Sequence, residues 1–314
     1  MIAWGFLGAG WVATTALAPA VHTAHNARLH GVASRDAGRA AALHPEQVYE
    51  SYEDLLADPK IDAVYINLAN DQHCQWSVAA LAAGKHVLCE KPLALNHAQA
   101  QVMADAAEKY NRRLVEAVWG RWHPRFRRIV ELVARGDIGD LGGINSSFCF
   151  TADLNQNYRL DPQMGGGSLL DVGVYQGHLW RALNQGEPEL KIESLTRSTG
   201  ASGVDLTTQI CGQLSNGVKV NAVSSFERAE MQEILISGDL ASIECLGNDA
   251  FTSWNKPSSL RIGDHVQEFA PVDPYRLMVE NFSDYILGAP AWLPAIDQSL
   301  YVAKLLDQIK ACDS

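Results

Sequence analysis

Residues 2–13 read IAWGFLGAGWVA, an apolar run that passes into a glycine-rich turn. The first six residues predict a buried strand, and the spacing Gly8-x-Gly10-x-x-Ala13 directly after it predicts a tight turn into a helix. In such a turn the first glycine allows the bend, the second lets the backbone approach a pyrophosphate, and the helix N-terminal amides hold the phosphate charge. A glycine turn without a ligand is the alternative, but the flanking strand and helix favour a dinucleotide site. Its predicted contacts are Gly8, Gly10, Trp11 and Val12.

The first part of the chain alternates short apolar runs with helical stretches, which is typical of a parallel sheet wrapped by crossover helices. One predicted helix is closed by Gly84, and the next begins at Asn96 with Gln99 completing a capping box. We therefore predict a doubly wound α/β domain over residues 1–120. Its predicted strands are 2–7, 29–34, 63–68, 86–89 and 114–117, and one predicted helix is 74–83.

Beyond the helix predicted over residues 125–135, the pattern changes to strands with apolar residues at every second position. Asn216-Gly217 predicts a hairpin with positive φ at both turn positions. Two closing helices are predicted, one from Asp273-Pro274 and one over residues 294–310. We predict an α+β domain over residues 121–314 with a large, mostly antiparallel sheet. Its predicted strands are 144–151, 190–198, 206–214, 218–226, 233–237, 242–246 and 259–262.

Composition excludes several functional classes. The 314 residues carry a formal charge of -11, which offers no basic footprint for nucleic acid or anionic membranes, so we expect neither partner. The longest apolar stretches are interrupted well before a membrane span is complete, and no secretion signal is visible. The six cysteines are scattered without a Cys-x-x-Cys pair, which predicts reduced thiols and a cytoplasmic location. No convincing cluster of metal ligands is seen in the sequence, so we expect no metal.

The end of the second predicted strand bears on the choice of dinucleotide. Ser34-Arg35-Asp36 stands where an NAD enzyme usually places an acid against the ribose hydroxyls. Arg35 can pair with a 2′-phosphate and stack on adenine, and Ser34 offers a small hydroxyl, so we predict NADP. The alternative is that Asp36 is the ribose acid and NAD the cofactor.

Two further segments carry candidate catalytic groups. Lys91 in Glu90-Lys91-Pro92 follows a strand at the carboxyl edge of the sheet, where an ammonium can stabilise alkoxide character; a surface lysine before a rigid turn is the alternative. Asp171 and Tyr175 are four apart on a predicted helix and so share a face, which suits orientation and proton transfer. From spacing alone, Ser168-x-x-Asp171 is equally a capping box, and Tyr175 is equally a packing residue.

Residues 8–13, GKHVLCEKP at 84–92 and GGGSLLDVGVY at 165–175 together resemble the family of glucose-fructose oxidoreductase, inositol dehydrogenase and dimeric dihydrodiol dehydrogenase (Gfo/Idh/MocA). The resemblance implies a Rossmann domain, a C-terminal domain with a large open sheet, and frequent dimerisation through that sheet. It also implies a nicotinamide whose reactive carbon faces the second domain. By position, Lys91 resembles the catalytic lysine, Asp171 the family carboxylate, and Tyr175 the proton-transfer residue of the dihydrodiol and glucose-fructose branches.

The same resemblance implies further contacts near the nicotinamide and the substrate. For His73 a simple helix-capping role is the alternative. Beyond the glycine turn, the predicted cofactor contacts are Ser34 and Arg35 from the end of the second strand, with Leu68, Asn70, His73, Glu90, Lys91 and Arg121. The implied substrate contacts are Trp119, Arg121, Tyr158 and His178.

We therefore predict an NADP-dependent oxidoreductase that moves a hydride between nicotinamide and a hydroxyl or carbonyl carbon of a sugar, sugar derivative or cyclic diol. The expected partners are a small polyhydroxylated substrate and a second copy of the chain. Two alternatives stay open: a non-redox glycosidase that uses held NAD transiently, and a dinucleotide-sensing regulator without chemistry.

Overall fold

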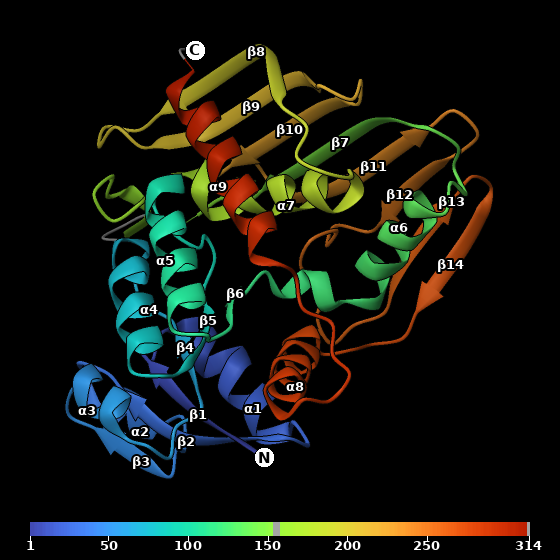
Figure 1. Ribbon diagram of the computed structural model, residues 1–314. Helices are drawn as coiled ribbons and strands as arrows, with labels where there is room; N and C mark the ends of the chain where they lie inside the picture. Colours follow the sequence, from blue (N-terminus) through green and yellow to red (C-terminus); the bar gives the residue numbers. More distant parts are fainter. Residues whose placement is uncertain (153–157, 313–314) are drawn as a thin grey trace. The chain divides into compact units, whose positions relative to one another are not determined.

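The computed structural model describes residues 1–152 and 158–312, which form two compact units. The first unit comprises Met1–Trp119 and Asp273–Leu300, and the second comprises Gly120–Val272 and Tyr301–Ser314. Each unit is built on one sheet (Figure 1). The assignment of cofactor binding to residues 1–120, and of substrate binding and dimerisation to 121–314, stays a prediction.

The sheet of the first unit is parallel throughout and confirms the predicted doubly wound domain, with strand order β3-β2-β1-β4-β5-β6. Every residue of β1 is buried, as expected for a central strand covered on both faces. The order of strands reverses between β1 and β4, and in such sheets ligands bind at the carboxyl ends of the strands around this point. The strands are β1 (Ile2–Leu7), β2 (Ala27–Ala33), β3 (Gln47–Tyr49), β4 (Ala63–Ile66), β5 (His86–Cys89) and β6 (Leu114–Glu116).

A helix from late in the chain, α8 (Pro274–Leu287), completes the first unit by packing against α1 (Figure 1). The indole N–H of Trp4 on β1 donates to Ser283 Oγ at 3.1 Å, and the Trp4 ring lies 5.3 Å from that of Phe282. Asp273 caps α8, as predicted. The other helical segments are η1 (Ala13–Leu17), α1 (Ala18–Thr23), α2 (Ala37–Ala41), α3 (Tyr52–Ala57), η2 (Asn70–Gln72), α4 (His73–Ala82) and α5 (His97–Lys109).

The sheet of the second unit has strand order β14-β13-β12-β11-β7-β10-β9-β8. Among the described strands of this sheet, only β7 and β10 pair in parallel. This confirms the mostly antiparallel prediction. The strands are β7 (Leu141–Cys149), β8 (Leu190–Thr199), β9 (Asp205–Leu214), β10 (Lys219–Ser225), β11 (Met231–Gly238), β12 (Ser242–Leu246), β13 (Ser258–Ile262) and β14 (His265–Phe269). The helical segments that lie wholly or partly in this unit are η3 (Trp119–Trp122), α6 (Pro124–Ala134), η4 (Tyr158–Leu160), η5 (Leu169–Gly173), α7 (Val174–Leu183) and α9 (Ile296–Ala311).

The two faces of this second sheet differ. Ile144 and Val220, which are register partners on β7 and β10, are fully buried on the face that carries α7. On the opposite face Asn221 donates from Nδ2 to Asn145 Oδ1 at 2.7 Å, and Leu235 is 39% exposed. One side of the sheet is therefore packed, and the other is uncovered within the unit.

No described helix of either unit is long and apolar enough to cross a membrane.

The hairpin between β9 and β10 forms where it was predicted, but the predicted turn geometry was wrong. Gly217 has φ +93°, whereas Asn216 is not among the described non-glycine residues with positive φ. Gly217 N donates to Leu214 O at 2.8 Å, and Leu214 N donates to Val218 O at 2.8 Å. A type I turn followed by one left-handed glycine therefore joins the strands, because the connection is longer than the two-residue turn that needs two positive φ values.

Candidate functional site

The turn after β1 leaves no room for side chains at its glycines. Gly8 has φ +95°, and a Cβ there would lie 2.2 Å from the carbonyl oxygen of Asn67. A Cβ at Gly10 would lie 3.0 Å from the side-chain amide of Asn67. The backbone amides at the start of the following helix have no partner within the helix. This turn therefore fits a dinucleotide pyrophosphate, which needs close backbone approach and amide donors.

Asn67 is a part of this turn that the sequence analysis missed. With its amide oriented to satisfy both neighbours, Asn67 Oδ1 accepts from Ala13 N at 3.1 Å and from Gly10 N at 3.3 Å. Asn67 directly follows β4, which pairs with β1, so its side chain reaches the turn across the sheet edge. The available signal was a polar residue at the carboxyl end of a buried strand, but the predicted strand 63–68 included it.

At the end of β2, Asp36 is committed to a local structural role. Its Oδ1 accepts from Arg39 N at 3.0 Å and caps α2, while Asp36 N donates to Ser34 Oγ at 3.3 Å. Arg35 is exposed. Burial raises the pKa of Tyr52, at the start of α3, and the charge of Arg35 opposes that rise. One Asp36 oxygen is thus already occupied, whereas Arg35 extends from the same segment.

The segment after β5 places Lys91 beside a buried carboxyl group. Glu90 is only 6% exposed, and its Oε1 accepts from the Tyr65 hydroxyl at 2.6 Å. Burial raises the pKa of Glu90 to about 6, although the Tyr65 hydrogen bond and the Lys91 charge oppose that rise. Lys91 is itself half-buried and is joined to Pro92 by a cis peptide. Lys91 therefore differs from the exposed surface lysine of the alternative interpretation.

His73 connects this segment to the loop after β4. Its fully buried ring lies between two carbonyl oxygens, with Nδ1 2.8 Å from Pro92 O and Nε2 3.2 Å from Leu68 O. Burial lowers the pKa of His73. Neither contact is a helix cap, so the ring instead holds two loops at the carboxyl edge of the sheet. Direct cofactor contact by Leu68, the buried Asn70 and His73 stays a prediction.

In the second unit, Asp171 forms an ion pair with Arg159. Arg159 Nε donates to Asp171 Oδ2 at 2.7 Å, and Nη2 lies 3.5 Å from Oδ1. The capping-box interpretation of Ser168 and Asp171 is wrong, because Ser168 makes no side-chain cap and donates to Asp205 Oδ2 at 2.7 Å. Asp205 also accepts from Leu169 N at 2.8 Å. Asp205 on β9 thus holds the start of the helix, and the Asp171 carboxylate does not cap it but pairs with Arg159.

Tyr175 is buried in an aromatic cluster on the same helical segment. Its ring centroid lies 5.4 Å from Phe148 and 6.1 Å from Phe251, and these two phenylalanines stack at 5.6 Å. The guanidinium of Arg159 lies 5.0 Å from the Tyr158 ring, and both Tyr158 and Tyr175 raise the pKa of Arg159 against the effect of burial. Arg159 therefore contacts Tyr158 and Asp171 and interacts electrostatically with Tyr175, although the sequence analysis did not select it.

The remaining predicted substrate residues are divided between the units. Arg121 is buried with Nη1 3.4 Å from His178 Nδ1, so these two belong together in the second unit. Trp119 belongs to the first unit, where its ring stacks on Tyr275 at 4.6 Å. Lys91 also belongs to the first unit, and its joint action with Asp171 and Tyr175 stays a prediction.

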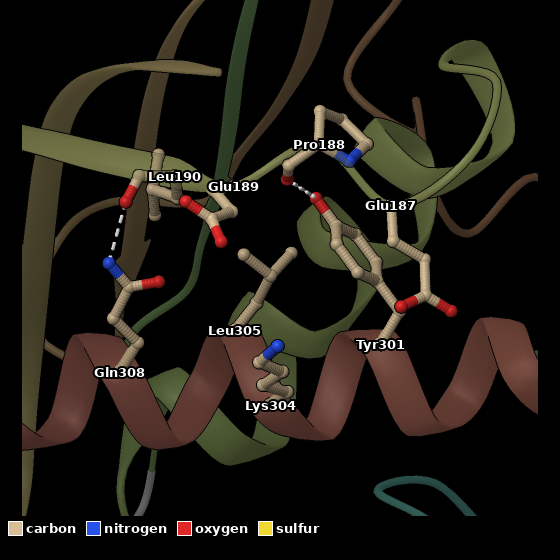
Figure 2. Close-up of a pocket in the computed structure, with 8 residues that line it drawn as sticks. All are labelled: Glu187, Pro188, Glu189, Leu190, Tyr301, Lys304, Leu305 and Gln308. Carbon is tan, nitrogen blue, oxygen red and sulfur yellow. Dashed lines mark hydrogen bonds between the residues drawn. The ribbon is translucent and has the colours of Figure 1, made fainter. Parts of the chain in front are cut away.

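Figure 2 shows a small pocket of about 180 Å³ in the second unit, between the segment around Pro188 and α9. The Tyr301 hydroxyl donates to Pro188 O at 2.6 Å, and Gln308 Nε2 donates to Leu190 O at 2.6 Å. These bonds fasten α9 to the start of β8. None of the residues lining this pocket is a predicted site residue. Across the described residues, no group of three or more His, Cys, Asp or Glu side chains is placed to hold a metal ion.

Comparison with known proteins agrees with this division into two parts. A family model described as oxidoreductase family, NAD-binding Rossmann fold, matches residues 2–118. A second, described as GFO/IDH/MocA C-terminal domain, matches residues 126–244.

Individual proteins resemble the chain over most of its length. A D-xylose 1-dehydrogenase (NADP(+)) of Haloferax volcanii is 34% identical over 98% of this chain and 95% of its own. A trans-1,2-dihydrobenzene-1,2-diol dehydrogenase of Mus musculus is 32% identical over 85% of this chain and 80% of its own. Among solved structures, KijD10, a 3-ketoreductase from Actinomadura kijaniata in complex with NADP and TDP-benzene, is similar with a TM-score of 0.88 and 26% identity. That similarity covers 98% of this chain and 97% of KijD10.

Proposed function

Because the chain belongs to the Gfo/Idh/MocA family of oxidoreductases, we propose that it is an NADP-dependent dehydrogenase or reductase of a sugar, sugar derivative or cyclic diol. Members that resemble it are named dehydrogenases of a sugar and of a diol, and both substrates present a CH–OH group for oxidation. The chain is thus an oxidoreductase with a Rossmann domain for NAD(P), and the substrate and the preference for NADP are the proposal.

The observation that carries the proposal is the pairing of an intact dinucleotide turn with candidate catalytic side chains. Gly8 and Gly10 allow the turn to pack tightly against Asn67, since a Cβ at either position would press on that residue, and a tight turn of this kind suits close backbone approach to a pyrophosphate. In our proposal Gly8, Gly10, Trp11 and Val12 hold the pyrophosphate, and Ser34 with Arg35 hold the 2′-phosphate. A regulator that only senses the dinucleotide has no use for Lys91, Asp171 and Tyr175.

When bound, the nicotinamide accepts the hydride in oxidation and supplies it in reduction. In oxidation the C–H bond breaks with its electron pair leaving as hydride, and the hydroxyl proton passes to the Tyr175 phenolate. Lys91 donates to the reacting oxygen and stabilises its developing negative charge. Asp171 orients the cationic groups or a neighbouring substrate hydroxyl. Reduction runs the same steps in reverse, with Tyr175 returning its proton to the alkoxide oxygen.

A panel of aldoses, keto-sugars and cyclic diols, assayed for net production or consumption of NADPH, tests this proposal. A dehydrogenase changes absorbance with at least one substrate. A glycosidase that uses held NAD transiently would release sugar without net absorbance change, and a regulator would bind dinucleotide and turn over nothing. Either of these last two results overturns the proposal.

We also propose that two copies associate through the large sheet of the second unit. The face that carries Asn145, Asn221 and Leu235 is uncovered within the unit, and an antiparallel sheet with one packed face offers the other for association. Light scattering should give about twice the 34.2 kDa chain mass. We propose a cytoplasmic location, with all six cysteines reduced, as they are in the structure. Cell fractionation tests the location.

A further inference from the structure

Arg159 is held against Asp171 in a geometry that a loosely placed surface ion pair does not have. Nε lies 2.7 Å from Oδ2 and Nη2 lies 3.5 Å from Oδ1, so two guanidinium nitrogens address both oxygens of one carboxylate. The Asp171 side chain is 8% exposed and the Arg159 side chain 28% exposed. Two-point contacts of this kind orient both partners, and partial burial reduces screening by water.

The backbone around Arg159 is fixed by the glycine run that precedes η5. Gly167 N donates to Arg159 O at 2.9 Å, and a Cβ at Gly166 would lie 2.4 Å from the same oxygen. Asp161 O accepts from Gly166 N at 2.8 Å. The glycines are therefore needed where the chain closes over the turn that carries Arg159. The same run then leads directly into the helical segment that carries Asp171 and Tyr175.

The third member of this arrangement is Tyr175. It follows Asp171 by four positions on one continuous helical segment, and it is close enough to Arg159 for the two charges to interact. A fixed cation beside a phenol favours the phenolate, whereas an unpaired carboxylate beside it disfavours the phenolate. Arg159 produces the first effect and removes the second, because it adds a positive charge and pairs with the nearby carboxylate of Asp171.

We propose that Arg159 is a positioning residue that sets the protonation state of Tyr175, by neutralising Asp171 and supplying a permanent positive charge within the same unit. The charge state of Tyr175 is then prepared by its own unit before Lys91 contributes. The consequence for catalysis rests on the proposed function, because the phenolate is the form that accepts the substrate proton in oxidation.

Titration of the Tyr175 phenol tests this inference without any substrate. The ultraviolet absorbance of phenolate is followed against pH for the wild type, Arg159→Met and Arg159→Lys. Each protein is paired with its Tyr175→Phe counterpart so that subtraction removes the other eight of the nine tyrosines. We expect the Tyr175 transition to move to higher pH in Arg159→Met and to return most of the way in Arg159→Lys. An unchanged transition in Arg159→Met overturns the inference.

Asp171→Asn supplies an independent test if Arg159→Met does not fold. It removes the negative charge and leaves Arg159 in place, so the Tyr175 transition should move to lower pH. A move to higher pH overturns the inference. A purely structural role for the ion pair predicts the same titration in Arg159→Lys and Arg159→Met, so a failure of lysine to restore the transition also overturns it.

Kinetics then separates this inference from the proposed function. For a substrate that the panel identifies, the acidic limb of kcat for oxidation should move to higher pH in Arg159→Met. A displacement by one pH unit lowers the rate on that limb about tenfold. If the titration moves as expected but no substrate supports turnover, the proposed function fails and the role of Arg159 stands. If turnover is found and the limb does not move, the role of Arg159 fails alone.

Discussion

The side chain of Lys91 lies at a boundary between buried and accessible groups. The adjacent Glu90 is buried and accepts a hydrogen bond from the Tyr65 hydroxyl, and this bond does not involve the lysine amine. We expect Lys91→Met to fold and bind NADPH with little change, and to lose about 10²–10³-fold in kcat/KM, the magnitude of one donor to a developing oxyanion. Initial-rate kinetics measure kcat/KM, and a fluorescence titration with NADPH measures the dissociation constant.

Lys109→Met is the matched control for this substitution, because Lys109 is exposed at the end of α5. It should leave kcat/KM and the NADPH dissociation constant unchanged. Equal turnover in Lys91→Met and the wild type would contradict the assigned role, and so would loss of NADPH binding that accounts for all of the lost activity.

Arg35 is the residue on which the preference for NADP depends. Arg35→Asp replaces the cation with a carboxylate that repels a 2′-phosphate and suits a ribose hydroxyl. The dissociation constant for NADP should rise at least about tenfold, and that for NAD should change by much less. Fluorescence titration of both dinucleotides measures this. Arg135→Asp makes the same charge change at an exposed arginine after α6, and it should alter neither dissociation constant. An equal loss of affinity for both dinucleotides in Arg35→Asp would contradict the assignment.

At the residue scale, the sequence revealed site residues that belong to a local motif. It did not reveal residues whose role depends on a contact with a residue distant in the sequence. The Gly8 and Gly10 spacing and the Lys91 segment were visible because motif and chemistry coincide in consecutive residues. Asn67 and Arg159 were not visible, because each acquires its role from a neighbour reached only through folding, across β1 and β4 or across the glycine run. The capping box at Ser168 was misassigned for the same reason, since Asp205 on β9 takes its hydroxyl.

Asp205 fixes the element that carries the second group of site residues. Its Oδ2 accepts from Ser168 Oγ at 2.7 Å, Leu169 N at 2.8 Å and Thr208 Oγ1 at 2.9 Å. Asp205→Ala should lower the free energy of unfolding by about 1–3 kcal/mol, because it leaves buried donors without an acceptor. Urea unfolding measures the change. Asp264→Ala, in the exposed turn between β13 and β14, should stay within about 0.5 kcal/mol of wild type, and a similar loss in both variants would contradict the anchoring role.

Element prediction succeeded where the strand is apolar and buried, and failed where its residues are polar or exposed. The central strands β1 and β5 were predicted to the residue, because buried parallel strands read as continuous apolar runs. β3 was missed, since it has three residues of which two are exposed. β14 was missed because its outward residues are polar and its pairing with β13 supplies the regularity that its sequence lacks. The turn at Asn216 was assigned the wrong φ because loop length, which pattern alone does not fix, selects the turn type.

At the scale of the whole molecule, the chain leaves the first unit and returns to it. Residues 273–300 lie far along the sequence but belong to the unit of the parallel sheet, where Ser283 and Phe282 contact Trp4 of β1. Sequence predicted α8 as a helix but not its partner, because an apolar helical face does not specify which apolar surface it covers. The parallel sheet therefore depends on residues from both ends of the chain.

Acid should destabilise both units through buried neutral histidines, one of which in each unit also accepts a hydrogen bond from a backbone amide. Burial, with smaller effects of Arg112 and Arg125, lowers the pKa of His86 and that of His123 to about 4. Each ring uses Nδ1 to accept a backbone amide at 3.0 Å, from Arg113 N and Arg125 N respectively, which requires an unprotonated nitrogen. The unfolded chain binds these protons near pH 6.5 and the folded chain does not, so stability is lost as pH falls from 6.5 toward 4.

Glu90 acts in the opposite direction within the first unit. Its pKa is raised to about 6, so the folded state binds its proton before the unfolded state does, and stability is gained as pH falls from 6 toward the ordinary carboxyl value. The acid sensitivity of the first unit is therefore partly offset. In the second unit the pKa values of Glu131 and Asp249 are lowered, so these carboxyl groups do not offset His123. The free energy of unfolding should fall from pH 7 to pH 5. In His123→Asn the slope of that fall should be smaller, because about one proton fewer is taken up on unfolding.

Asparagine is the informative replacement because it keeps an oxygen acceptor for the α6 N-terminus but does not take up a proton. Urea unfolding of the wild type, His123→Asn and His265→Asn at pH 7, 6 and 5 gives the pH dependence directly. His265 is exposed on β14, so its replacement should leave the dependence as it is in the wild type. If His123→Asn retains the full wild-type loss between pH 7 and pH 5, the cap nitrogen is not the group whose protonation destabilises the second unit.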